Sequence, residues 1–187
     1  MPSPIHSPKL NIRSMALMGL TTAILCLLAP FSLLLPFSPI PISLGTFAIY
    51  LLVCIFETRQ CVISVLLYIL LGFLGLPVFS GFMGGAAILL GPTGGYILGY
   101  FFLTLISSII INKEKHKSSF CLIGLLLGTF VCYLFGTIWL IYQSKLTFHA
   151  ALLVAVIPFL PGDAIKLAIA VPLGGQLRKR LFKAGLL

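Results

Sequence analysis

Long apolar stretches recur along the whole chain of 187 residues, and they constrain its fold more than any other feature. Apolar residues make up 60% of the sequence and charged residues only 8%, and the mean hydropathy is +1.19. A soluble domain of this length has too little interior to hide so much hydrocarbon from water. The sequence therefore predicts an all-α integral membrane protein, with the lipid bilayer around a single membrane domain over residues 1–187.

Six apolar segments predict six transmembrane helices. Proline turns, a glycine-rich stretch and short charged segments separate them. The predicted helices cover residues 14–35, 43–56, 61–76, 92–111, 119–142 and 149–176. Residues 1–13 then form an N-terminal segment, residues 14–177 a six-helix bundle, and residues 178–187 a basic tail.

The basic residues predict how the chain is oriented in the membrane. With six crossings, ten of the twelve Lys and Arg residues fall on one side, Lys145 falls on the other, and Lys166 lies within a helix. The ten are Lys9, Arg13, Arg59, Lys113, Lys115, Lys117, Arg178, Lys179, Arg180 and Lys183. Cytoplasmic segments carry an excess of Lys and Arg, so both termini are predicted to be cytoplasmic. These residues form no basic patch, so no nucleic-acid partner is expected.

Two charges interrupt the last apolar segment. Asp163 and Lys166 are three positions apart, so they share one face of a helix. A charge inside a membrane segment costs about 2.5–3.5 kcal/mol on insertion scales, and such residues usually face a cavity and carry function. Pro161 and Gly162 loosen the backbone just before the pair, which favours a polar ligand site. A structural ion pair between helices is the alternative.

A glycine-rich, uncharged stretch covers residues 78–91. Glycine lets the backbone approach a ligand closely, and a helix beginning at Pro92 would offer unpaired amides to an electronegative group. Phe79, Tyr96 and Tyr100 would add ring surfaces with polar tips. The sequence thus suggests a second part of a ligand site, with a glycine-lined helix crossing as the alternative.

Small residues four positions apart suggest close contacts between helices. Internal packing is the expected role of each such pattern taken singly. The patterns are Gly19-xxx-Ala23, Gly95-xxx-Gly99 and Gly124-xxx-Gly128.

Catalysis has no support in the sequence. The chain contains no G-x-x-x-x-G-K-[ST] phosphate loop, and Asp163 alone cannot form the pair of carboxylates that an intramembrane aspartyl protease needs. The three histidines, His6, His116 and His149, are scattered, so no metal cluster is expected. The five cysteines form no C-x-x-C pair and are interpreted as small packing residues.

Five motifs in order resemble the BioY family, the biotin-specific substrate-binding (S) components of energy-coupling factor (ECF) transporters. The motifs are Pro41-Ile-Ser-Leu, Tyr68-xxx-Gly72-xx-Gly75-Leu-Pro-Val-Phe79, Gly91-Pro-Thr-Gly-Gly-Tyr96, Tyr133-Leu-Phe-Gly-Thr-Ile-Trp139 and Pro161-Gly-Asp-xx-Lys166. The resemblance spans about residues 14–177. It implies a six-helix S component in a bacterial cell membrane that binds biotin from the outside and serves its uptake.

The resemblance also implies partners. An S component docks through its first helix on a membrane coupling subunit driven by two ATPases, which explains why this chain lacks a phosphate loop. Gly19 and Ala23 thereby become candidates for partner docking, although the family pattern there is more often Ala-xxx-Ala. Gly45 is a second departure, because many relatives carry a polar residue at this position. Thr46 is expected to substitute for it in part.

Under this resemblance, Asp163 is expected to accept a hydrogen bond from a ureido N–H of biotin, and Lys166 to donate to acceptors of the ring or ureido group. Aromatic rings would enclose the bicyclic rings of biotin, and glycine backbone would close over them. The candidate binding residues are Asp163, Lys166, Tyr96, Phe79, Gly81, Gly84, Gly85, Gly91, Thr93, Tyr100 and Thr46. An S component for another vitamin and a membrane scaffold protein are the alternatives.

Overall fold

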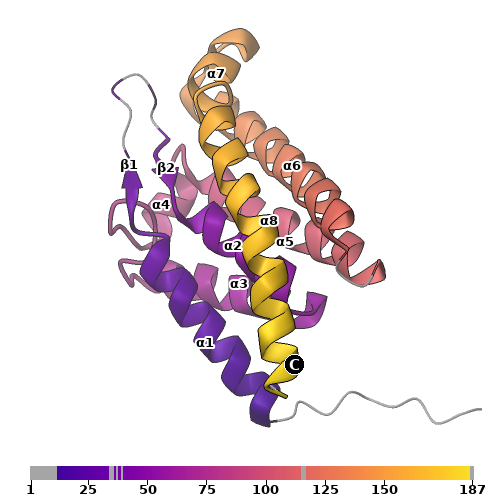
Figure 1. Ribbon diagram of the computed structural model, residues 1–187. Helices are drawn as coiled ribbons and strands as arrows, with labels where there is room; N and C mark the ends of the chain where they lie inside the picture. The colour runs from indigo at the N-terminus through magenta and orange to yellow at the C-terminus, as the bar shows by residue number, and fades with distance from the viewer. Residues whose placement is uncertain (1–11, 34–35, 37, 39, 115–116, 186–187) are drawn as a thin grey trace, which may run out of the picture.

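The computed structural model describes residues 12–33, 36, 38, 40–114 and 117–185. All of its elements are helices, apart from two short strands near the beginning (Figure 1). The elements are α1 (Ile12–Leu28), β1 (Ser32–Leu33), β2 (Ile42–Ser43), α2 (Gly45–Ile55), α3 (Thr58–Phe73), α4 (Ala86–Leu90), α5 (Gly94–Lys113), α6 (Ser118–Ser144), α7 (Phe148–Ala155) and α8 (Phe159–Lys183). Lys9, Lys115, His6 and His116 lie outside the described residues.

Each of the six predicted segments contains a helix, but the first ends earlier than predicted. α1 ends at Leu28, so the helix predicted over residues 14–35 was wrong at its C-terminal end. Pro30 explains the difference, because proline has no amide to donate and disfavours helical backbone in the residue before it. The chain then forms β1, which pairs antiparallel with β2 so that Ser32 lies opposite Ser43.

The last predicted segment is broken, and the glycine-rich stretch contains a helix that was not predicted. α7 and α8 are bent by 45° at a break between residues 155 and 159, where Pro158 precedes the first helical residue of α8. α4 is a short helix of five residues within the glycine-rich stretch, where no helix was predicted. Both differences are local, and they leave the order of the predicted segments unchanged.

Within the described residues, three parts of the fold have the length and apolar character of membrane spans. α5 and α6 each qualify alone, and α7 with α8 qualifies as one bent pair. α1, α2 and α3 are apolar but shorter, with 17, 11 and 16 residues. Eight of the eleven residues of α2 are buried by neighbouring elements, so little of this helix remains to face lipid.

Glycines let α5 and α6 pack closely. A Cβ atom at Gly95 of α5 would lie 2.2 Å from the Cβ atom of Trp139, and one at Gly128 of α6 would lie 2.2 Å from the hydroxyl oxygen of Ser107. Ser107 donates a hydrogen bond of 2.9 Å to the carbonyl of Gly124. These glycine patterns therefore lie at the crossing of the two helices.

Hydrogen bonds gather several helix ends at one end of the molecule. Gln60 joins α3 to Ser14 of α1 at 3.2 Å, and Asn112 at the end of α5 donates to Thr58 of α3 at 2.9 Å. Arg13 of α1 donates to the carbonyl of Gly185, just beyond α8. The start of α1 and the end of α8 thus lie together, away from α7 and the β1–β2 pair (Figure 1).

Two adjacent glycines on α8 test how closely this helix must pack on α2. A Cβ atom at Gly174 would lie 2.5 Å from the Cβ atom of Cys54, whereas one at Gly175 would have no atom within 4 Å. Gly174→Ala is expected to lower the melting temperature of the purified protein, because overpacking costs about 1–3 kcal/mol. Gly175→Ala should leave it unchanged or raise it, because alanine favours the helix more than glycine and displaces no neighbour there. Equal melting temperatures for both variants would contradict the close contact between α2 and α8.

Candidate functional site

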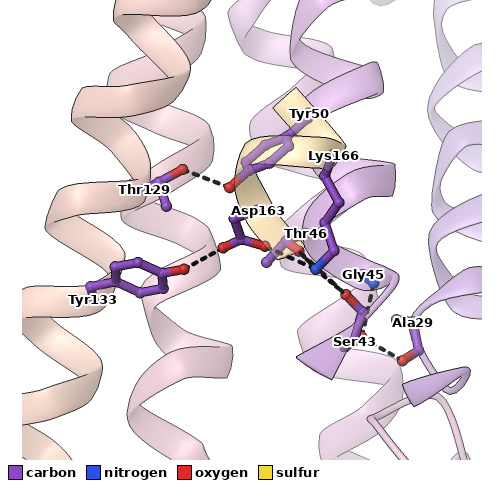
Figure 2. Close-up of polar contacts among 9 residues, drawn as sticks. All are labelled: Ala29, Ser43, Gly45, Thr46, Tyr50, Thr129, Tyr133, Asp163 and Lys166. Atoms are coloured by element: carbon purple, nitrogen blue, oxygen red, sulfur yellow. Dashed lines mark hydrogen bonds and ion pairs between the residues drawn. The ribbon is translucent and has the colours of Figure 1, made fainter. Parts of the chain in front are cut away.

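An ion pair buried inside the bundle is the centre of the candidate site. The Nζ atom of Lys166 lies 2.9 Å from Oδ1 of Asp163, and the two side chains are 11% and 7% exposed. Both residues lie on α8, where their spacing of three positions places them on the same face (Figure 2). The structure thus brings together the two charges that the sequence singled out.

The ammonium group of Lys166 is fully hydrogen-bonded. Besides Asp163, it donates to the carbonyl oxygen of Ser43 at 2.7 Å and to the hydroxyl oxygen of Thr46 at 2.8 Å. An ammonium group has three protons, so each of them has a partner. Lys166 consequently ties α8 to β2 and α2 (Figure 2).

Tyr133 of α6 is the second partner of Asp163. Its hydroxyl donates to Oδ2 of the carboxylate, the oxygen that Lys166 does not contact (Figure 2). Tyr133 was not among the predicted site residues, although it begins one of the motifs that carry the family resemblance. Its place in that motif was the available signal.

Ser43 shapes the backbone that Lys166 contacts. Its hydroxyl donates to the carbonyl of Ala29 at 2.8 Å and accepts from the amide of Gly45 at 2.8 Å. A Cβ atom at Gly45 would lie 3.1 Å from both the Cβ atom of Ala29 and the hydroxyl oxygen of Ser43. A side chain at position 45 would therefore press against Ala29, just beyond the end of α1.

Two cavities meet beside the ion pair. The smaller, of about 40 Å³, contains the charged end of the site, and the larger, of about 280 Å³, adjoins it. Both are lined by Ile40, Pro41, Tyr96 and Tyr100. We call them the charged compartment and the large compartment. Together they form one site with a charged end and a mainly apolar body.

Eight of the eleven predicted binding residues line these compartments. Asp163, Lys166 and Thr46 line the charged compartment, and Tyr96 and Tyr100 line both. The other three line the large compartment and are Phe79, Gly81 and Thr93.

Three predicted residues line neither compartment and instead belong to the glycine-rich segment beside the site. They are Gly84, Gly85 and Gly91. A Cβ atom at Gly84 would lie 2.2 Å from the carbonyl oxygen of Leu76. Gly85 has a φ of 96° and its amide donates to Gly72 at 2.7 Å. The carbonyl of Gly91 accepts from the indole nitrogen of Trp139 at 2.9 Å. Their glycine character thus serves local packing and turns.

The helix N-terminus expected at Pro92 does not offer the predicted row of unpaired amides. α5 begins at Gly94, and its amide donates to Gly91 at 3.0 Å. The amides of Tyr96 and Ile97 both donate to the carbonyl of Thr93, at 3.1 and 3.2 Å. A tight turn before the helix uses these three amides, so the helix does not begin at Pro92 and these groups are not available to a ligand.

The aromatic walls are fixed by contacts outside the cavity. The hydroxyl of Tyr96 lies 3.1 Å from that of Thr137 and 3.2 Å from the carbonyl of Ala155, which ties α5 to α6 and α7. The ring of Phe79 meets that of Tyr68 edge to face at 5.6 Å between centroids. Both rings therefore offer a ligand a rigid apolar surface.

Gly19 and Ala23 lie elsewhere, on the exposed face of α1. A Cβ atom at Gly19 would have no neighbour within 4 Å. Neither residue is used for packing inside the bundle. Their surface is open to lipid or to a partner.

Comparison with known proteins places the chain among transport proteins. The model of the BioY family matches residues 4–183. The chain is 32% identical to the biotin transporter BioY2 of Lactococcus lactis over 91% of its length and 93% of that protein. It is 31% identical to the biotin transporter BioY of Thermotoga maritima, over 90% of this chain and 97% of that protein.

A solved structure shares the fold. It is the 2.1 Å crystal structure of the S-component for biotin from an ECF-type ABC transporter. The TM-score is 0.83 at 30% sequence identity, and the match covers 95% of each chain.

The hydrogen bond from Tyr133 to Asp163 can be tested by removing one hydroxyl. Tyr133→Phe leaves one oxygen of a buried carboxylate without its donor, which is expected to cost about 1.5–3 kcal/mol of stability and to lower the melting temperature without ligand. Tyr142→Phe is the matched control, because Tyr142 is on the same helix and 81% exposed. A Tyr133→Phe protein as stable as the control would argue against the hydrogen bond.

Proposed function

The chain belongs to the BioY family, and we propose that it is the biotin-binding S component of an ECF transporter, a multi-pass membrane subunit that serves biotin uptake. The observation that carries this proposal is the buried Asp163 carboxylate, held by Lys166 and Tyr133 at the charged end of an aromatic-walled cavity. The site combines fixed polar groups with an apolar body, as binding sites for small molecules usually do.

Biotin has a ureido group with two N–H donors and one carbonyl acceptor, a thioether ring, and a carboxylate on a flexible arm. We place the ureido group in the charged compartment, where Asp163 accepts one of its N–H groups. Each carboxylate oxygen has two acceptor positions, so the bonds from Lys166 and Tyr133 leave room for a ligand. Phe79, Tyr96 and Tyr100 then flank the rings.

Lys166 has a more restricted role than the sequence suggested. All three of its protons already have partners, so donation to the ureido carbonyl requires that one partner be exchanged. Thr46 is the candidate for this exchange, because its hydroxyl keeps a second bond of 3.3 Å to the carbonyl of Ser43. Lys166 therefore serves first to hold Asp163 in position.

The proposed membrane topology has six crossings and both termini in the cytoplasm. α1, α2, α3, α5, α6 and the α7–α8 pair supply the crossings. The hydrogen-bonded helix ends support this topology, because they bring together Arg13, Lys113 and the basic end of α8. Lys145 lies at the opposite end of α6 from Lys117.

The proposed energy source is a separate module of a membrane coupling subunit and two ATPases. The exposed face of α1 that carries Gly19 and Ala23 is the proposed docking surface for the coupling subunit. Small residues permit close approach of helices in membranes. A chain without a phosphate loop depends on such a partner for ATP hydrolysis.

A ligand screen tests the proposal against its alternatives. Biotin, thiamine and riboflavin are added separately to detergent-solubilised protein, and the melting temperature is measured. A ligand present at 100 times its Kd stabilises the folded state by about 2.7 kcal/mol, so biotin alone should raise the melting temperature. A shift with thiamine or riboflavin instead would identify an S component for another vitamin, and no shift would favour a scaffold protein.

Asp163→Asn is expected to weaken biotin binding. Hydrogen bonds to charged groups contribute about 1.5–3 kcal/mol, so the Kd measured by calorimetry should rise about tenfold to a hundredfold. Glu114→Gln is the control, since Glu114 lies beyond the end of α5 and outside both compartments. Wild-type affinity in Asp163→Asn would rule out the assigned contact.

Ala23→Leu is expected to weaken association with the coupling subunit while leaving the Kd for biotin unchanged. The larger side chain prevents close approach at the proposed docking surface. Ala168→Leu provides the same substitution at an exposed position of α8. Co-purification of the coupling module with each variant measures the effect, and equal recovery with Ala23→Leu and Ala168→Leu would refute the docking surface.

A further inference from the structure

Ser32 carries a hydroxyl group that the described part of the chain leaves without a hydrogen bond. Its hydroxyl oxygen is buried and has no hydrogen-bond partner among the residues that the structure describes. Ser32 lies on β1 and lines the large compartment. Ser43, directly opposite it on β2, uses its own hydroxyl for two structural hydrogen bonds. The two serines lie opposite each other in the same strand pair, and among the described residues Ser43 alone of the two makes such bonds.

A buried hydroxyl without a partner is costly, because it has lost its hydrogen bonds to water. Most buried polar side chains in native proteins have a partner, and the exceptions call for an explanation. Rotation about one bond is enough to redirect a serine hydroxyl. A ligand in the large compartment that offers an acceptor would remove the cost.

The large compartment also has a distinctive electrostatic character. None of the described residues that line it is charged, and its polar side chains carry hydroxyl groups. Besides Ser32, those from outside the tyrosine walls are Ser80 and Thr93. The compartment is therefore suited to bind an acceptor through neutral donors, without an ion pair.

The position of Asp163 decides which end of biotin lies in the large compartment. With the ureido group in the charged compartment, the arm must extend away from it, and the compartment of about 40 Å³ has little further space. The carboxylate of the arm is repelled by the carboxylate of Asp163, and this repulsion favours their separation. The large compartment is the adjoining space.

We propose that Ser32 is a specificity-determining residue whose hydroxyl donates a hydrogen bond to the carboxylate of the biotin arm. This inference rests on the proposed function. The site then has two poles, with Asp163 accepting from the ureido group at one end and a neutral hydroxyl donating to the acid at the other. Lys166 belongs to the first pole, so the acid is bound without a cation from the described lining.

The test compares two ligands on three variants of the full chain in detergent. The ligands are biotin and an analogue in which a methyl group replaces the carboxyl group of the arm. Ser32→Ala should raise the Kd for biotin about tenfold and leave the Kd for the analogue nearly unchanged. Ser32→Thr keeps the hydroxyl group, and threonine is well suited to a strand, so this variant should bind biotin with the affinity of the wild type.

Thermal stability without ligand separates this role from a structural one. Ser32→Ala should melt at the wild-type temperature or above, because it removes an unsatisfied hydroxyl. Ser43→Ala should melt lower, because it breaks two hydrogen bonds, and its loss of affinity should be the same for both ligands.

Three results would overturn the inference alone, and a fourth would also reject the proposed function. Equal biotin affinity in wild type and Ser32→Ala, an equal loss for both ligands, or a destabilised unliganded Ser32→Ala would each reject Ser32 as the acid-binding donor while leaving biotin binding intact. A wild-type chain that binds no biotin would instead reject the proposed function together with the inference.

Discussion

The buried ion pair between Asp163 and Lys166 is the interaction on which the arrangement of the site depends. Withdrawing two charges from water is costly, and their mutual attraction offsets that cost only when further hydrogen bonds satisfy the remaining donors and acceptors. Ser43, Thr46 and Tyr133 supply them here. Because these residues lie on β2, α2 and α6, the need to satisfy one pair on α8 fixes the relative positions of four elements.

A structural ion pair and a ligand site are therefore compatible interpretations of the same residues. Lys166 uses its three protons on the protein, which is a structural role. Asp163 receives one donor on each oxygen and keeps acceptor capacity, which suits it to an N–H group of a ligand. The two members of the pair thus have different roles. The lysine orders the site, and the proposed role of the carboxylate is to recognise biotin.

The sequence predicted the features that depend on local spacing and missed those that depend on distant contacts. Apolar length located the helical segments, and the i, i+3 spacing placed Asp163 beside Lys166. Tyr133 was not predicted as a partner, because 30 positions separate it from Asp163 and only the crossing of α6 with α8 brings them together. Pro30 was a local signal that the predicted helix boundary ignored. The glycine-rich stretch misled for another reason, since glycines that approach neighbouring backbone and glycines that approach a ligand look the same in a sequence.

The end of α1 joins the proposed docking surface to the ligand site through the backbone. The carbonyl of Ala29 accepts from Ser43, which in turn carries the carbonyl that Lys166 contacts. The carbonyl of Pro30 accepts from the amide of Gly81, in the loop that lines the large compartment, at 2.9 Å. Two walls of the site are thus hydrogen-bonded to the two residues that directly follow the helix carrying Gly19 and Ala23. The segment that links the docking surface to the site is therefore only two residues long, and both of its residues are hydrogen-bonded to walls of the site.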